Sequence, residues 1–222
     1  MVSISSAKLI QERTIRFCLN ISDWDCLENP QLYKKLDEHL QKEYDIIPDK
    51  ERVGKGTVYI AKYVAKATFI YLDTNSKQKT RYYIAFSERS FEQGEKLKSS
   101  LLKHFSLLVL SEIISSYPKC FEEYIPLIKR WALHEDWIVR ETIGHSIRAV
   151  LKKIPKKTMK FLKDPSKSTE ENLRRLASES LRPLADIKWL RDPTKNHIQF
   201  SKLIRLTKYT PEKMRNLMKM WI

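Results

Sequence analysis

Glycine is scarce in this chain, with 4 residues among 222, so few positions suit tight hairpin turns or glycine-rich phosphate loops. The three cysteines have no C-x-x-C spacing, which argues against a disulfide framework and against a zinc knuckle. No run approaches 18 apolar residues, and the opening residues lack the apolar region of a secretory signal. We therefore expect a soluble, cytoplasmic, helix-rich protein with reduced thiols at Cys18, Cys26 and Cys120.

Motifs of common enzyme classes are also missing. Gly54-Lys-Gly56-Thr57 does not satisfy the P-loop pattern, His134-Glu135 is not part of H-E-x-x-H, and no G-x-S-x-G occurs. The five histidines are scattered without ligand spacing, so neither a metal site nor a cofactor is expected.

Positive charge is abundant and unevenly placed. The formal net charge is +15, of which residues 1–150 contribute +3 and residues 151–222 contribute +12. Such an excess indicates a polyanionic partner or an anionic membrane face. Five lysines fall within nine residues, which fits either a solvated helix end or a binding patch: Lys152, Lys153, Lys156, Lys157 and Lys160.

Apolar residues recur at three- and four-residue spacing along the chain, which predicts an all-α fold. The expected helices cover residues 5–20, 30–44, 57–72, 96–116, 121–133, 137–153, 156–163, 171–183, 186–190, 198–208 and 211–221. Thr80–Phe86 is rich in β-formers, so a strand is an alternative there. A helix is preferred because no partner strand is evident.

A 34-residue internal repeat is visible in the second half. This offset lays Val139–Ile147 over Leu173–Leu181 without a gap and places Leu127-Ile-Lys on Phe161-Leu-Lys. Paired helices at that period are typical of HEAT and TPR repeats. A third, abbreviated copy is expected because the pattern of residues 155–163 returns 56 residues later, at 211–219.

The repeat predicts the organisation of the chain. We expect a single α-solenoid domain of antiparallel helix pairs over residues 1–222, with helices of unclear repeat character in 1–95 and HEAT-like repeats in 96–222. A stacked repeat normally ends in a polar cap, whereas this chain ends in Met220-Trp-Ile. We therefore expect either a truncated carboxyl terminus or a partner that covers it.

The start of the helix expected over residues 137–153 gathers an aromatic, an acidic and a basic side chain. Trp137 and Glu141 are four apart and share one helix face. The 34-residue offset places Arg174 and Arg175 at the positions of Arg140 and Glu141. An indole, a carboxylate and guanidinium groups would then line one groove.

The same pattern is also compatible with purely structural roles for these residues. In this interpretation the indole belongs to the core, the carboxylate lies on a solvated face, and Arg140 only pairs with Asp136 four residues before it. Asp136 is in either case a natural N-cap for this helix.

The residues of the next repeat resemble a signature of a known protein family. The run Arg174-Arg-Leu-Ala-Ser-Glu-Ser-Leu-Arg-Pro183, followed by Trp189, resembles the R-R-L-A-S-E-x-x-R-P signature of AlkC-type DNA alkylation repair proteins. These proteins group with the AlkD type as HEAT-like repeat alkylpurine DNA glycosylases. The Trp137-x-x-x-Glu141 element is similar to the tryptophan-x-x-x-carboxylate element of that family, and the resemblance covers about residues 117–193. Glu141 stands where the AlkD type has Asp, and Ser180 where the AlkC signature has Gly.

The resemblance implies an armadillo-like superhelix that binds double-stranded DNA in a basic concave groove and hydrolyses the N-glycosidic bond of N3- or N7-alkylated purines. It implies Glu141, Trp137 and Arg175 as the catalytic residues, with Arg174 less favoured than Arg175. The implied DNA-binding residues are Arg140, Arg148, Lys152, Lys153, Lys156, Arg174, Arg182 and Trp189. No metal, cofactor or membrane is expected, and a monomer is favoured. The competing hypothesis is a non-catalytic HEAT-repeat protein that binds DNA, including branched or damaged DNA, or that scaffolds protein partners.

Overall fold

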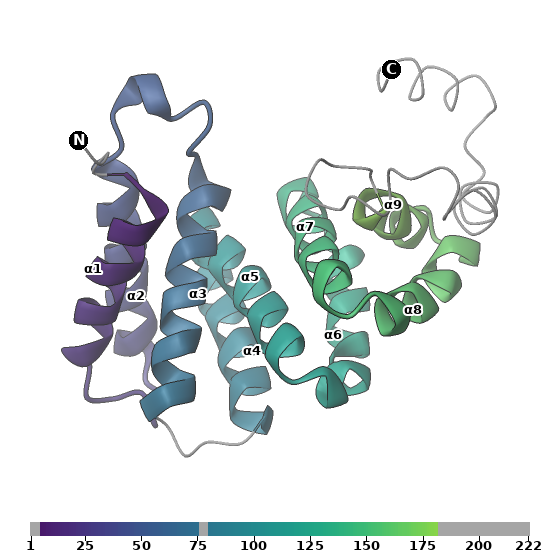
Figure 1. Cartoon of the computed structure of the whole chain (residues 1–222), viewed down its shortest axis with the longest axis horizontal. Coiled ribbons are helices and arrows are strands. Elements are labelled where there is room, and N and C mark those ends of the chain that lie inside the picture. Colours follow the sequence, from purple (N-terminus) through teal and green to yellow (C-terminus); the bar gives the residue numbers. More distant parts are fainter. Residues whose placement is uncertain (1–4, 76–79, 182–222) are drawn as a thin grey trace. The chain divides into compact units, whose positions relative to one another are not determined.

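The computed structural model describes residues 5–75 and 80–181, and every regular element within these ranges is helical, as the apolar periodicity predicted. Figure 1 shows the elements in chain order. They are α1 (Ala7–Leu19), α2 (Pro30–Asp45), the 3-10 turn η1 (Asp49–Glu51), α3 (Thr57–Asn75), α4 (Thr80–Lys96), α5 (Ser100–Ser116), the 3-10 turn η2 (Pro118–Cys120), α6 (Phe121–Ala132), α7 (Trp137–Lys153), α8 (Pro155–Lys167) and α9 (Glu171–Ser180).

The chain divides into two compact units, residues 1–126 and residues 127–222. The division falls inside α6, at Pro126. Pro126 lies within α6, which continues to Ala132, and it removes one backbone hydrogen bond of that helix. The expected start of the HEAT-like repeats, between residues 95 and 96, falls in the last turn of α4.

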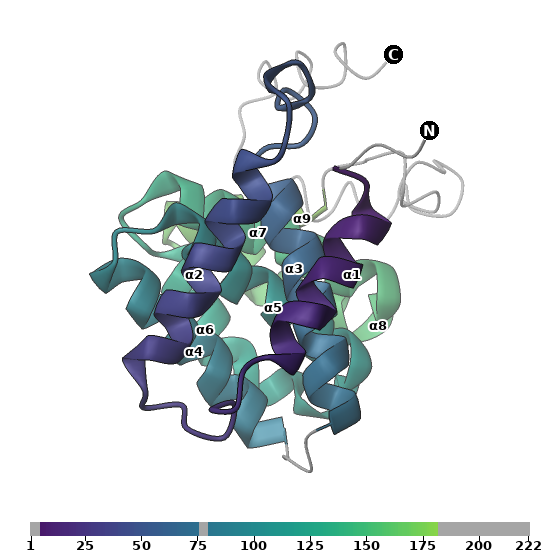
Figure 2. The same cartoon turned by 90° about the vertical axis from the view of Figure 1, so that its left-hand side faces the viewer.

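The amino-terminal unit is built around α5. Its apolar side chains are buried on every side, from Leu102 and Phe105 to Ile114, and the helix packs against both α3 and α4. In turn, α1 lies against α3, and α2 contacts α3 and α5. Figure 2 views α1 and α2 from the outside of this unit. A helix buried all round is the expected centre of an all-α core.

The turn between α4 and α5 corrects the helix expected over residues 96–116. Lys98 adopts a left-handed conformation with φ 53°, which ends α4. Ser99 then caps α5 by accepting a hydrogen bond from the backbone N–H of Leu102 at 3.0 Å. One expected helix is therefore the end of α4, a turn and α5, and the β-rich segment 80–86 is the start of α4 rather than a strand.

The described part of the carboxyl-terminal unit contains the end of α6 and the helices α7, α8 and α9, of which the last three pack against one another. The starts of α6 and α8 are 34 residues apart, and so are the starts of α7 and α9. The same hydrophobic positions are buried in both copies, as with Ile128 and Leu162, or Ile143 and Ala177. A repeated helix pair thus underlies the sequence repeat. The third copy and the helices expected over 186–190, 198–208 and 211–221 lie outside the described residues.

The three cysteines are free thiols, as expected. Cys18 and Cys120 are buried and Cys26 is exposed. Burial raises the pKa of the Cys18 thiol to about 12, so this thiol is protonated and unreactive near neutral pH.

Candidate nucleic-acid interface

The loop before α7 is held by an arginine of that helix. Asp136 caps α7 by accepting from the backbone N–H of Ile138 at 2.9 Å, and its own N–H donates to His134 Nδ1 at 3.0 Å. Arg140 Nη1 reaches back and donates to the carbonyls of His134 and Glu135, both at 2.6 Å. The Arg140 guanidinium is therefore part of the loop that starts α7.

The loop before α9 is built in the same way, 34 residues later. Arg174 Nη1 donates to the carbonyls of Ser168 and Thr169, at 2.9 and 2.7 Å. The N–H of Glu170, the N-cap of α9, donates to Ser168 Oγ at 3.1 Å. Arg174 thus has the structural role of Arg140, since each guanidinium donates to carbonyl oxygens of the loop before its own helix.

Arg148 joins α7 to α9. Its side chain is buried, and the guanidinium donates to the carbonyl oxygen of Glu179 and lies 3.9 Å from the Glu179 carboxylate. One turn earlier, a Cβ on Gly144 would lie 3.1 Å from Glu179 Cβ, so the two helices approach closely there. Arg148, expected to contact DNA, is directed to a neighbouring helix rather than to solvent.

Trp137 is the first residue of α7, and 56% of its surface is exposed. The interpretation of this indole as a core residue is therefore wrong. Leu133, just before the loop, is also exposed. An exposed indole is an uncommon feature of a folded surface and is typical of binding sites.

Glu141 and Arg175 are half-buried on α7 and α9. Their side chains form no hydrogen bond or ion pair with any residue in the ranges 5–75 and 80–181. Glu141 is three residues before Gly144, and Arg175 four before Glu179, so each lies one turn from the close approach and on the same face of its helix. Arg175 therefore differs from Arg174, whose guanidinium donates to the backbone of the loop before α9.

The lysines expected to bind DNA are all on the surface: Lys152 and Lys153 at the end of α7, and Lys156 in the first turn of α8. Sequence reasoning missed that the exposed row continues along α8 to Lys163 and Lys167. The signal was present in the sequence as a spacing of four, three and four residues from Lys156 to Lys167. Arg182 and Trp189, also expected to bind DNA, lie outside the described residues.

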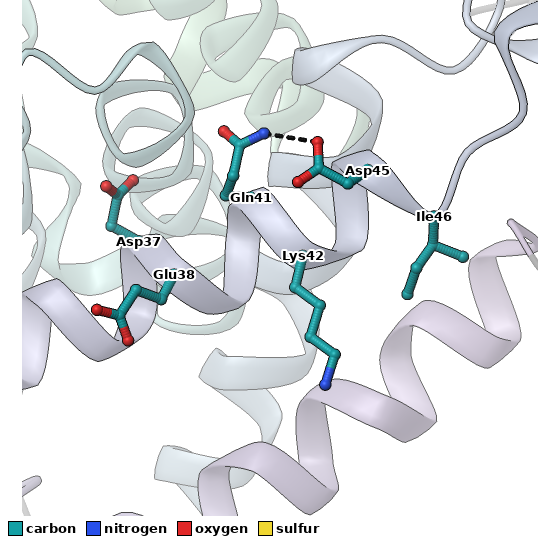
Figure 3. Close-up of a pocket in the computed structure, with 6 residues that line it drawn as sticks. All are labelled: Asp37, Glu38, Gln41, Lys42, Asp45 and Ile46. Carbon is teal, nitrogen blue, oxygen red and sulfur yellow. Dashed lines mark hydrogen bonds between the residues drawn. The ribbon is translucent and has the colours of Figure 1, made fainter.

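A shallow, open pocket of about 560 Å³ lies on α2 in the amino-terminal unit. Figure 3 shows its lining, in which Gln41 Nε2 donates to Asp45 Oδ1 at 2.8 Å beside the carboxylates of Asp37 and Glu38. None of the residues selected from the sequence lines this pocket. Its acidic walls are unsuited to a polyanion.

No helix within residues 5–75 and 80–181 combines the length and apolar character needed to cross a bilayer. Comparison with protein-family models, with curated proteins and with solved structures finds no match to this chain.

Proposed function

We propose that this chain is a cytoplasmic DNA alkylation repair protein related to the AlkC and AlkD types. In this proposal its helix pairs stack as a HEAT-like α-solenoid, bind double-stranded DNA and hydrolyse the N-glycosidic bond of purines alkylated at N3 or N7. The observation that carries the proposal is the start of α7. The indole of Trp137 is exposed there, and one turn later the Glu141 carboxylate has no partner among the described residues.

The chemistry assigns a role to each side chain. A purine alkylated at N3 or N7 is cationic, so the bond from C1′ to the base breaks with its electron pair moving to the base, which leaves neutral. The sugar meanwhile develops oxocarbenium character, as in glycoside hydrolysis. The Glu141 carboxylate stabilises that charge, orients the water whose oxygen bonds to C1′, and accepts the proton that the water loses.

Trp137 and Arg175 bind the substrate rather than move protons. The face of an exposed indole attracts a cationic base. A guanidinium that makes no hydrogen bond within the protein can bind a phosphate through paired N–H donors. Among the described residues Arg175 meets this condition, whereas Arg174 donates to two loop carbonyls. The 34-residue repeat supports the solenoid, because its two copies share helix starts and loop hydrogen bonds.

The test is release of free methylpurine from methylated duplex DNA. We expect release by the unmodified chain and a rate lower by about 10²- to 10³-fold for Glu141→Gln, as is typical when a group that stabilises transition-state charge is removed. Glu171→Gln is the matched control, because Glu171 is the exposed first residue of α9 and should keep the full rate. Equal rates for Glu141→Gln and the unmodified chain would remove Glu141 from the mechanism.

A second candidate is a protein that binds DNA without chemistry, which the exposed lysines of α8 favour independently of Glu141. This candidate predicts retardation of duplex DNA in a gel with no base released. A scaffold for protein partners predicts neither.

A further inference from the structure

The solvent face of α8 carries a straight row of lysines. Lys156, Lys160, Lys163 and Lys167 are all exposed, and at 3.6 residues per turn they fall within an arc of about 60°. The opposite face is buried and consists of Thr158, Phe161, Leu162, Pro165 and Ser166. We call these four lysines the α8 lysine row.

The row is not neutralised within the fold. None of its four ammonium groups forms a hydrogen bond or ion pair with a residue in the ranges 5–75 and 80–181. Lysines of the amino-terminal unit contrast with this: Lys55 lies 2.5 Å from a carboxylate oxygen of Glu51, and Lys103 lies 3.0 Å from one of Glu95. The charge of the α8 lysine row is therefore available to a partner.

The arrangement is unfavourable for the helix itself. Like charges three and four residues apart repel each other by a few tenths of a kcal/mol per pair. The first turn of α8 contains Lys156 and Lys157 and no acidic residue, so these cations oppose the positive end of the helix dipole. Its N-cap, Ile154, makes no side-chain hydrogen bond. The lysines in the first turn of α8 therefore do not stabilise this helix.

We propose that the α8 lysine row binds the phosphate backbone of double-stranded DNA without reading its sequence. This deepens the proposed function and rests on its DNA-binding part, but it does not need catalysis. The row spans about 16 Å along the helix axis, which suits a linear polyanion rather than one small anion. Lysine is a flexible point charge and makes no bidentate contact with a base edge, so its contribution is independent of sequence.

Two features favour duplex DNA over a single strand and over an anionic membrane surface. Single strands are normally bound with aromatic side chains on which bases stack, and the aromatic residue of α8, Phe161, is buried. A helix that lies on a membrane inserts an exposed apolar face, whereas the apolar face of α8 is covered by α7 and α9.

The test replaces the row in the full chain by Lys156→Gln, Lys160→Gln, Lys163→Gln and Lys167→Gln together. Gln has nearly the helix propensity of Lys, so α8 should still form, and circular dichroism checks this. Binding of an unmodified DNA duplex is followed by fluorescence anisotropy at several salt concentrations. We expect the slope of log K against log salt to become shallower by about 3 to 4, because each phosphate that a lysine neutralises adds about 0.9 to the slope.

The matched control removes the same charge elsewhere. Lys34, Lys35, Lys50 and Lys66 are exposed on the amino-terminal unit, and changing all four to Gln should leave most of the slope intact. Equal changes of slope in the two quadruple variants would overturn the proposal, because net charge alone would then explain binding. An unchanged slope in the row variant, or weaker binding confined to phosphatidylserine vesicles, would overturn it as well.

This design separates the row from the enzyme. If the unmodified chain binds duplex DNA through the row but releases no methylpurine, the glycosylase proposal fails and the row stands. If methylpurine is released at the full rate and with unchanged affinity by the row variant, the row fails and the glycosylase stands.

Discussion

The two units differ in the contacts that one prominent set of charged side chains makes in each. In the amino-terminal unit Arg13 donates through Nε and Nη2 to both carboxylate oxygens of Glu43, at 2.7 and 2.5 Å, and only 1% of Glu43 is exposed. In the carboxyl-terminal unit the α8 lysine row faces solvent without a partner among the described residues. The Arg13–Glu43 pair therefore supports the fold of the first unit, whereas the α8 lysine row makes no such contact within the described part of the second.

The sequence contains this contrast in a coarse form. Residues 1–150 have a net charge of +3 and residues 151–222 of +12, so cations and anions nearly balance only in the first part. Similar numbers of cationic and anionic side chains permit ion pairs to form. A buried ion pair makes the stability of the fold depend on both of its members. An unpaired surface cation contributes little to stability and can be exchanged without unfolding the chain.

The largest expected effect is therefore in the amino-terminal unit. Arg13→Ala leaves the Glu43 carboxylate buried without its partner, and we expect the free energy of unfolding to fall by about 4 kcal/mol, as is usual when one member of a buried pair is removed. Urea denaturation followed by circular dichroism measures it.

Two variants serve as controls for the loss of stability expected for Arg13→Ala. Lys8, whose side chain is 84% exposed, lies 3.9 Å from Glu12, and Lys8→Ala should change stability by less than about 0.5 kcal/mol. Lys160→Ala, in the other unit, should be equally mild. A loss of stability for Lys160→Ala as large as that for Arg13→Ala would break the contrast between the units.

A buried histidine gives the second effect. His39 Nε2 lies 3.0 Å from Thr14 Oγ1, and its ring stacks on Phe17 at 4.2 Å. Burial lowers the pKa of His39 from 6.5 to about 4. The unfolded chain therefore binds the proton more readily, so this contribution to stability is complete above about pH 6.5 and is lost as the pH falls toward 4.

The expected loss of stability from His39 over that range is about 3 kcal/mol, at 1.36 kcal/mol per pKa unit. Denaturation at several pH values compares the unmodified chain with His39→Gln, which keeps a hydrogen-bonding group but does not titrate. The difference between the two stability curves should slope between pH 6.5 and 4. Parallel curves would show that His39 does not become charged on unfolding.

The sequence predicted the helices well because most of them have one apolar face and clear ends. The helix expected over 137–153 is α7 with identical bounds. The start of α4 was harder to predict as a helix, since Tyr82 and Tyr83 favour strands by propensity. Packing overrides propensity there, because Tyr83 stacks on Tyr117 at 6.0 Å and its exposed fraction is 2%.

The sequence predicted where the candidate residues lie along their helices, but not which side chains and backbone groups surround them. Pattern placed Trp137 and Glu141 on one face of a helix, and the structure agrees with that placement. It gave no sign that Arg148 would be buried against Glu179, because that depends on how α9 crosses α7. The repeat alignment already paired Arg140 with Arg174, but a shared loop-holding role required coordinates.

The smallest effect concerns the carboxyl-terminal unit, where the guanidiniums of Arg140 and Arg174 support the fold, as that of Arg148 does. Arg174→Ala removes two hydrogen bonds from a charged donor to loop carbonyls, at 2.9 and 2.7 Å, and we expect the free energy of unfolding to fall by about 1.5 kcal/mol. Arg140→Ala should be destabilised by a similar amount because Arg140 makes the equivalent bonds. Arg175→Ala is the matched neighbour and should stay within about 0.5 kcal/mol of the unmodified chain while weakening DNA binding. If Arg174→Ala and Arg175→Ala were equally destabilising in urea denaturation, the division between structural and available guanidiniums would be wrong, and Arg175 would lose its place in the proposed site.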